Sequence, residues 1–232
     1  MVGLKSAIAV LLLLAIDVAS QNQIDILKSG AGKWNKWRAE NPDVRPDLPY
    51  SDLRGAHLAQ TNLEGAYLRG ANLDSADLGG ADLRGASLVG AHLQCTHLER
   101  ANLLGAHLQR AHFQGAYLKE ANLRGANLRG ANLRGADLWE ANIVGAHLQG
   151  TYLQGAHLGG ANLDIADLGT VRSFYKVRLD SGILSKIKIK WPEKLATIWD
   201  DIKMDWVIDD TLLEQVKKPD WQGWAKDGNQ GK

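Results

Sequence analysis

Residues 53 to 168 carry a large apolar side chain at every fifth position without a slip. That side chain is leucine throughout, except for Phe113 and Ile143. The residue two before it is usually alanine, the residue just before it is polar, and glycine dominates two residues after it. A period of five fits neither the 3.6 residues of an α-helix nor the 2 of a β-strand. The pattern therefore predicts a chain that turns a corner every five residues.

Each five-residue unit is expected to point its large apolar side chain and its small residue into an axial core. Glycine at the corner tolerates a positive φ angle, which most side chains disfavour. Four corners close one square coil of 20 residues, and successive coils stack at about the 4.8 Å spacing of paired strands. The 24 units then give six coils, a rod about 29 Å long on that spacing.

The array of A-(D/N/H)-L-X-G units, such as ANLRGANLRGANLRGADL from Ala121 to Leu138, resembles the pentapeptide repeat family of bacteria. The segment LKSGAGKWNKWRAENPDVRPDL, residues 27–48, is similar to the N-terminal caps of cyanobacterial members. The resemblance implies an all-β solenoid, a right-handed quadrilateral β-helix of about six coils. It also implies an N-terminal helical cap, to which we add a mixed or helical C-terminal cap.

The ends of such a rod need covers, because the terminal coils would otherwise expose apolar side chains and open backbone edges. Residues 21–47 are expected to form the N-terminal capping helix, with apolar residues at helical spacing (Ile24, Leu27, Ala31, Trp34) and a stop at Asn41-Pro42. The repeats occupy residues 48–170, and residues 171–232 form the C-terminal capping region. There we expect a strand-like alternation (Ile187, Ile189, Trp191) and a helix beginning near Pro192. Seven of the eight tryptophans lie outside the repeats, which favours a role in the caps over a ligand cage.

Residues 1–20 form an apolar N-terminal segment, with Lys5 followed by an unbroken apolar run from Ala7 to Ile16. Ten residues are too few for a membrane-spanning helix, which needs about 20. The length and the small residues Val18-Ala19-Ser20 favour a signal peptide. We therefore expect export to the periplasm, the thylakoid lumen or the extracellular space. An uncleaved membrane anchor, or a cytoplasmic protein with an apolar capping helix, is the alternative.

Four histidines and the single cysteine, Cys95, fall within residues 91–113. The square coil places His92 directly above His112, whereas His97 and His107 point from other faces. All seven histidines occupy the slot usually held by Asp or Asn, so they are expected to act as outward-facing polar residues. Zinc sites need three or four converging ligands. We therefore predict no metal site and no cofactor, with His92 and His112 as weak candidates. Cys95 stands in an outward slot that usually holds glycine, which indicates a tolerated substitution.

One predicted column alternates imidazole, carboxylate and phenol side chains (His57, Asp77, His97, Tyr117, Asp137, His157). Such a column resembles fragments of acid–base machinery. A flat stacked face, however, offers neither the pocket nor the oriented nucleophile that catalysis requires. The sequence therefore predicts a protein that is not an enzyme.

The charge of the chain is nearly balanced, with 27 basic and 26 acidic side chains. The repeats, residues 51–170, carry nine basic and eleven acidic side chains, a net charge of −2. Arg124, Arg129 and Arg134 fall on successive faces of the coil, so they do not form the clustered cations of a nucleic-acid groove. We expect no direct contact with nucleic acid.

These features favour a non-enzymatic scaffold or protein-interaction rod with an unknown protein partner. A second copy of the chain, bound through the C-terminal region as a homodimer, is an alternative partner. The alternative comes from the family resemblance, since some members mimic B-form DNA and regulate DNA gyrase. That class predicts a strongly acidic, often dimeric, cytoplasmic rod, whereas this rod is nearly neutral and follows a signal-like segment.

Overall fold

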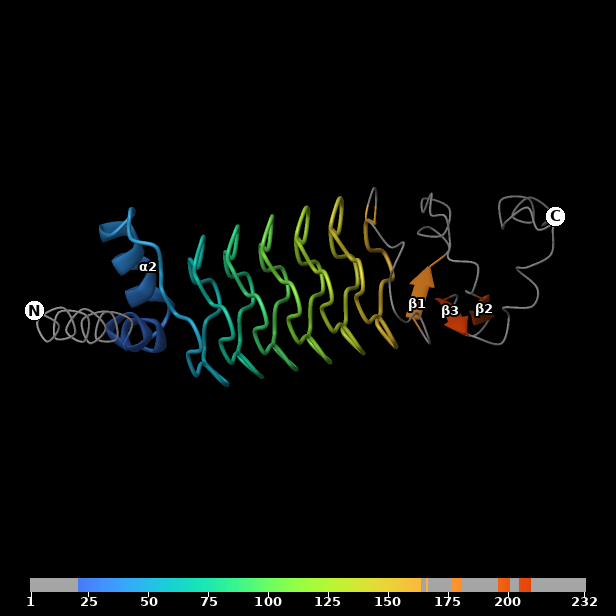
Figure 1. The fold of residues 1–232 in the computed structure, drawn as a ribbon, viewed down its shortest axis with the longest axis horizontal. Coiled ribbons are helices and arrows are strands. Elements are labelled where there is room, and N and C mark those ends of the chain that lie inside the picture. Colours follow the sequence, from blue (N-terminus) through green and yellow to red (C-terminus); the bar gives the residue numbers. More distant parts are fainter. Residues whose placement is uncertain (1–20, 164–165, 167–176, 181–195, 201–204, 210–232) are drawn as a thin grey trace, which may run out of the picture.

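The computed structural model describes residues 21–163 and 166 and three short strands within residues 177–209. The expected signal segment, residues 1–20, lies outside the described residues. The described repeats form a rod of stacked coils that begins beside two N-terminal helices (Figure 1). Among the described residues, no helix has the length and apolar character needed to cross a bilayer.

The coils are held together by parallel bridges between residues one coil apart, from Asp47↔Tyr67 to Asn142↔Asn162. Each bridge is framed by two backbone hydrogen bonds. The Leu53 N–H donates to the Asn72 carbonyl at 2.8 Å, and the Asn72 N–H donates to the Ser51 carbonyl at 2.9 Å. Because a corner follows every bridge, no continuous strand forms in the repeats that the structure describes. The chain folds as a β-helical solenoid with four units in each coil. The predicted last units, up to residue 170, lie partly outside the described residues.

The core is a stack of the apolar side chains that set the period. From Leu48 to Leu158, each of them is no more than 2% exposed. The alanines two residues before them are also buried, except Ala56, which is partly buried. Thr61 and Thr96 replace alanine, and their hydroxyls donate to backbone carbonyls of the core at 2.7 and 2.8 Å. The core is therefore apolar along its length, and its few polar atoms are hydrogen-bonded.

The corners have the positive φ angles expected from the sequence. Corner glycines from Gly55 to Gly160 have φ between 61° and 70°. Where another residue takes the corner, as Cys95 and Glu140 do, φ is 54° and 55°. Such a corner side chain leans over the corner one coil further on, and a glycine often stands there. The Cγ of Glu140, for example, would lie 2.8 Å from a Cβ atom at position 160.

Two helices, rather than the single helix expected, precede the first coil. Residues 21–28 are helical, and α2 spans Ala31–Glu40. Gly30, with φ 109°, separates the two helices because this backbone conformation cannot continue a helix. The helix α2 ends at Asn41 as predicted, since the residue before Pro42 is driven out of helical geometry. Trp34 is fully buried, and its indole Nε1 donates to the Asn62 carbonyl at 2.7 Å.

Three strands are described in the C-terminal region: β1 (Val177–Asp180), β2 (Ala196–Asp200) and β3 (Asp205–Asp209). They form an antiparallel sheet in the order β1-β3-β2. The prediction of a helix after Pro192 is wrong for residues 196–200, which form β2. The β-branched and aromatic residues of β2 favour a strand. The alternation at Ile187, Ile189 and Trp191 lies outside the described residues.

Candidate interaction faces

The bridges align the polar residues of the rod into four flat faces, numbered here in chain order around the coil. Face 1 carries Asp47, Tyr67, Ser87, His107, Asn127 and His147. Face 2 carries Asp52, Asn72, His92, His112, Asn132 and Tyr152. Face 3 carries His57, Asp77, His97, Tyr117, Asp137 and His157, and face 4 carries Asn62, Asp82, Asn102, Asn122, Asn142 and Asn162. Each unit belongs to the face of its polar residue. Faces 1 and 3 are opposite, because they lie two units apart in a four-unit coil.

On face 2 the imidazole rings of His92 and His112 stack as the sequence predicts. Their centroids are 5.0 Å apart and their planes differ by 16°. Asn72 and Asn132 continue the column above and below them. Within the described residues, no group of three or more His, Cys, Asp or Glu side chains converges as a metal site would require. The geometry brings together two imidazoles, fewer than the ligands of a structural zinc site.

The N-terminal half of face 3 contains an open hollow of about 340 Å³. Its lining combines two imidazoles, two carboxylates and two small corner residues (Gly55, His57, Ser75, Asp77, His97, Glu99). The His97 Nδ1 lies 3.1 Å from the Glu99 Oε1, and the His97 ring stacks on Tyr117 with centroids 4.7 Å apart. Tyr117 is 43% exposed. The hollow thus presents imidazoles and carboxylates to solvent, with the exposed Tyr117 beside it, and Glu99 is a member that the column of polar residues does not include.

The C-terminal half of face 3 is built around Trp139, which the predicted column of polar residues does not include. The His157 Nδ1 lies 3.3 Å from the Asp137 Oδ1, and the indole of Trp139 is tilted against the His157 ring at 5.0 Å. A Cβ atom at Gly159 would lie 2.4 Å from the indole ring. Glycine one coil after the tryptophan therefore makes room for the ring, and this pairing of positions one coil apart was visible in the sequence.

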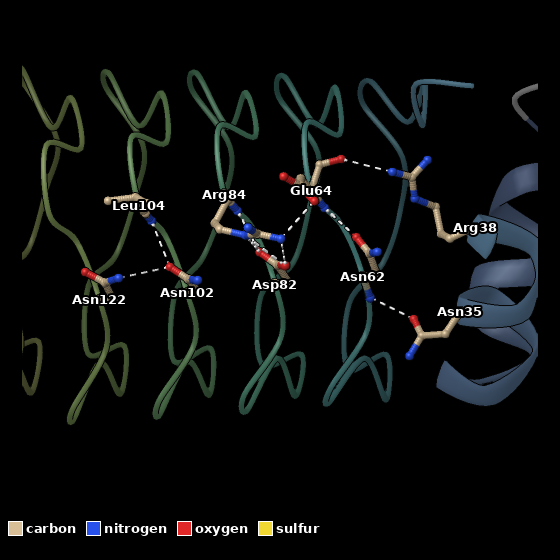
Figure 2. A network of polar contacts seen from close by, with 9 residues as sticks. All are labelled: Asn35, Arg38, Asn62, Glu64, Asp82, Arg84, Asn102, Leu104 and Asn122. Atoms are coloured by element: carbon tan, nitrogen blue, oxygen red, sulfur yellow. Dashed lines mark hydrogen bonds and ion pairs between the residues drawn. The ribbon is translucent and has the colours of Figure 1, made fainter. Parts of the chain in front are cut away.

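Face 4 continues the surface of α2 as a ladder of polar contacts (Figure 2). The Asn62 N–H donates to the Asn35 side-chain carbonyl at 2.7 Å, and the Arg38 guanidinium donates to the Glu64 carbonyl at 3.4 Å. Further along the rod, the Asn122 amide donates to the Asn102 side-chain carbonyl at 3.1 Å. Many hydrogen-bonding groups of face 4 are therefore already bonded within the molecule.

Arg84 is the central charge of face 4 (Figure 2). Its guanidinium lies 2.7 Å from the Asp82 carboxylate and 2.9 Å from that of Glu64. Burial alone would raise the pKa of Asp82, but hydrogen bonds from the Arg84 side chain and backbone N–H outweigh it, so that this pKa is below its usual range. On face 3, the hydrogen bond from Arg100 likewise lowers the pKa of Glu120, against a smaller effect of burial.

Face 1 is the basic face of the rod. Its units between residues 66 and 150 carry Arg69, Arg110 and Arg129, and no carboxylate. All three arginines are exposed. The Arg129 Nε donates to the Gln149 Oε1 at 2.8 Å. As predicted, Arg129 lies on a different face from Arg124 and Arg134, its neighbours in the sequence.

Cys95 lies at an exposed corner, as the sequence predicts. Its Sγ lies 4.0 Å from the Gln114 carbonyl and packs over Gly115 in the next coil. The thiol therefore fills the space above a glycine, as other corner side chains do.

The repeats match a known family model. The model for pentapeptide repeats matches eight copies, over residues 51–90, 81–119, 91–130 and 131–169, just over half of the chain. No curated protein sequence matches the chain.

Several solved structures of pentapeptide repeat proteins are similar to this chain. HetL, involved in heterocyst differentiation regulation in the cyanobacterium Nostoc sp. strain PCC 7120, is 30% identical over 59% of this chain and 79% of its own, with a TM-score of 0.30. Rfr23 from the cyanobacterium Cyanothece 51142 is 31% identical over 60% of this chain and 97% of its own, with a TM-score of 0.39. AT2G44920 from the thylakoid lumen of Arabidopsis thaliana is 29% identical over 47% of this chain and 72% of its own, with a TM-score of 0.35.

Proposed function

The chain belongs to the pentapeptide repeat family, and from this premise we propose that it is a non-enzymatic protein-interaction rod. The observation that carries this proposal is face 3. Its half-buried aspartates, its imidazoles and the exposed Tyr117 form one flat column along a buried leucine core. Aromatic side chains with polar neighbours are typical of protein-binding surfaces. The partner is a protein, and neither nucleic acid nor a cofactor is part of the function.

The proposal also covers the handedness of the coils, their number and the two caps. The coils wind in the right-handed sense of the family's quadrilateral β-helix, and six coils fill residues 48–170. Residues 21–47 act as the N-terminal cap, supported by the burial of Trp34 and Leu27 against the core. Residues 171–232 act as the C-terminal cap, which could also hold a homodimer together.

Site-specific photo-crosslinking tests the proposed function. A photoreactive phenylalanine analogue at Tyr117 on face 3 is expected to give discrete protein adducts in the native cell, identified by mass spectrometry. The same analogue at Asn122 on face 4 is the matched control, because it lies five residues later in an adjoining unit. Absence of protein adducts from position 117, or equal adducts from both positions, would contradict the proposal.

A regulator of DNA gyrase that mimics DNA is the second candidate. The five carboxylates on face 3 favour it (Asp77, Glu99, Glu120, Asp137, Glu140). The exposed arginines of face 1 count against it, since a DNA mimic requires dense negative charge. A supercoiling assay separates the two functions. Inhibition of gyrase at stoichiometric amounts of the protein would establish the second candidate and reject the first.

We also propose that residues 1–20 direct export, to the periplasm, the thylakoid lumen or the extracellular space. The unbroken apolar run and the small residues before Gln21 support this destination. Cell fractionation with N-terminal sequencing is expected to find a mature start near Gln21 outside the cytoplasm. An intact Met1 in the cytosol would reject export, and an intact Met1 in membranes would indicate an anchor.

A further inference from the structure

Opposite faces of the rod carry opposite charges. The units of face 1 between residues 66 and 150 hold three arginines and no carboxylate. The units of face 3 between residues 56 and 160 hold five carboxylates and two cations, Arg100 and Lys119. Both cations lie beside Glu120, at 2.8 and 3.9 Å. Among the described residues, the other four carboxylates of face 3 have no lysine or arginine partner within 4 Å.

The two side faces lack this excess charge. On face 2 the Arg54 guanidinium lies 2.7 Å from the Asp52 carboxylate. On face 4 Arg84 pairs with two carboxylates, as described above. The rod is therefore polarised across its axis, although its repeats are nearly neutral in total.

The charges on faces 1 and 3 also share a spacing. Arg69 and Arg129 hold the same slot of face 1 and are separated by three coils. Asp77 and Asp137 hold the same slot of face 3 and are also separated by three coils. At the spacing of paired strands, three coils span about 14 Å. Two arginines on one rod can therefore meet two carboxylates on another rod at the same time, with the rods either parallel or antiparallel.

We propose that the rod binds a second copy of this chain side by side, with face 1 of one copy against face 3 of the other. This inference rests on the proposed interaction function and names a partner for it. The contact is heterologous, because each copy contributes a different face, so a third copy can add to the row. Its affinity depends on exposed charge pairs, which salt screens, so association weakens as the ionic strength rises.

Analytical ultracentrifugation of the full chain tests this association. At low ionic strength we expect species larger than the monomer, which dissociate in about 0.5 M salt, where the Debye length is well below 10 Å. The double variants Arg69→Gln/Arg129→Gln and Asp77→Asn/Asp137→Asn are each expected to weaken association at least tenfold. Circular dichroism confirms that each variant keeps its fold. The pair Asp52→Asn/Arg134→Gln on face 2 is the control and is expected to associate like the natural chain.

Mixing the two double variants tests the heterologous geometry. Each variant keeps one intact face, so the equimolar mixture is expected to form a 1:1 dimer that cannot extend into rows. A monomeric natural chain at low salt would overturn the proposal, and so would association that survives both face variants, as a C-terminal dimer would. The proposed function is judged separately, because adducts of a different protein at position 117 support it even if copies of this chain do not associate.

Discussion

Trp139 and Gly159 show how a single residue depends on the residue one coil away. The backbone of Gly159 does not have a positive φ, so alanine is compatible with its conformation, but the added Cβ would lie 2.4 Å from the indole. We expect Gly159→Ala to displace the ring and lower the free energy of unfolding by about 1–3 kcal/mol, as overpacking does. Denaturant unfolding measures the change.

Gly79→Ala is the control for this prediction. Gly79 holds the same slot of face 3, and its added Cβ would lie 3.2 Å from the Asp77 Oδ1 and 4.0 Å from the Glu99 carbonyl oxygen. A smaller loss of stability is expected there. Removing the indole in Trp139→Ala/Gly159→Ala should cancel most of the overpacking cost. Equal losses for Gly159→Ala and Gly79→Ala would show that the indole does not restrict position 159.

Asp82 predicts a dependence of stability on pH. Its pKa is lowered in the folded protein, so its deprotonated form favours folding. This contribution is fully present above the ordinary Asp pKa of about 3.9 and is lost as the pH falls through the lower pKa of the folded state. Arg84→Met removes the guanidinium that lowers the pKa. We expect the natural chain to be more stable than Arg84→Met at pH 7, and the difference to disappear at acid pH.

Denaturant unfolding at pH 7 and at acid pH measures this difference, and Arg124→Met is the control variant. Arg124 lies on face 4 two coils further on, and its guanidinium lies within 4 Å of no carboxylate among the described residues. Its replacement should change stability little, and equally at pH 7 and at acid pH. A difference between the natural chain and Arg84→Met that stays constant with pH would contradict the role of Asp82.

Residues such as Phe113 and Cys95 could be placed from the sequence, because the five-residue period alone fixes which side chains point inward and which take the corners. The contact between His97 and Glu99 could not be placed. It depends on the rotamers of two exposed side chains, and the period does not specify rotamers.

At the scale of elements, Trp34 is the largest fully buried side chain that joins the N-terminal helices to the first coil. We expect Trp34→Ala to lower the free energy of unfolding by about 3–5 kcal/mol, because it leaves a large cavity. Trp34→Phe keeps most of the volume but leaves the Asn62 carbonyl without its indole donor, a loss of about 1–3 kcal/mol. Denaturant unfolding followed by circular dichroism measures both.

Trp37→Ala is the matched control, since Trp37 is only partly buried and lies 5.0 Å from the Trp34 ring. Its loss should be clearly smaller. If Trp34→Ala lowered the free energy of unfolding by less than about 1 kcal/mol, α2 would not be an integral cover of the first coil.

The sequence predicted these elements unevenly. The repeats were predictable because each of their units repeats the same local signal. The break at Gly30 was missed because the apolar spacing from Ile24 to Trp34 continues across it. The sequence does not predict strand β2, because Pro192 indicates a helix start, whereas Thr197, Ile198 and Trp199 favour extended backbone.

At the scale of the whole molecule, the repeats have a total charge near zero although opposite faces of the rod carry opposite charges. The net charge of −2 over the repeats gives no sign of a charged face. Sorting the same residues by face gives a basic face 1 opposite an acidic face 3. The predicted coil of four units already contains this information, because its closure decides which charges lie together, but the total charge does not reveal it.

Because the coil closes after four units, the number of residues removed by a deletion decides on which face all later residues lie. Removing residues 101–105, a single unit, keeps every leucine inside but turns all later units by one face. Arg134 then replaces Arg129 on face 1, whereas Asp137 moves to face 2 and Arg124 joins face 3, which loses most of its acidic excess. Removing residues 101–120, a whole coil, leaves every later residue on its face and shortens both charge spacings to two coils. We expect ultracentrifugation to find that the whole-coil deletion still forms rows and the single-unit deletion does not. If both shortened rods formed rows, the faces would not direct the association. A lineage could therefore lengthen or shorten such a rod by whole coils without altering what each side presents.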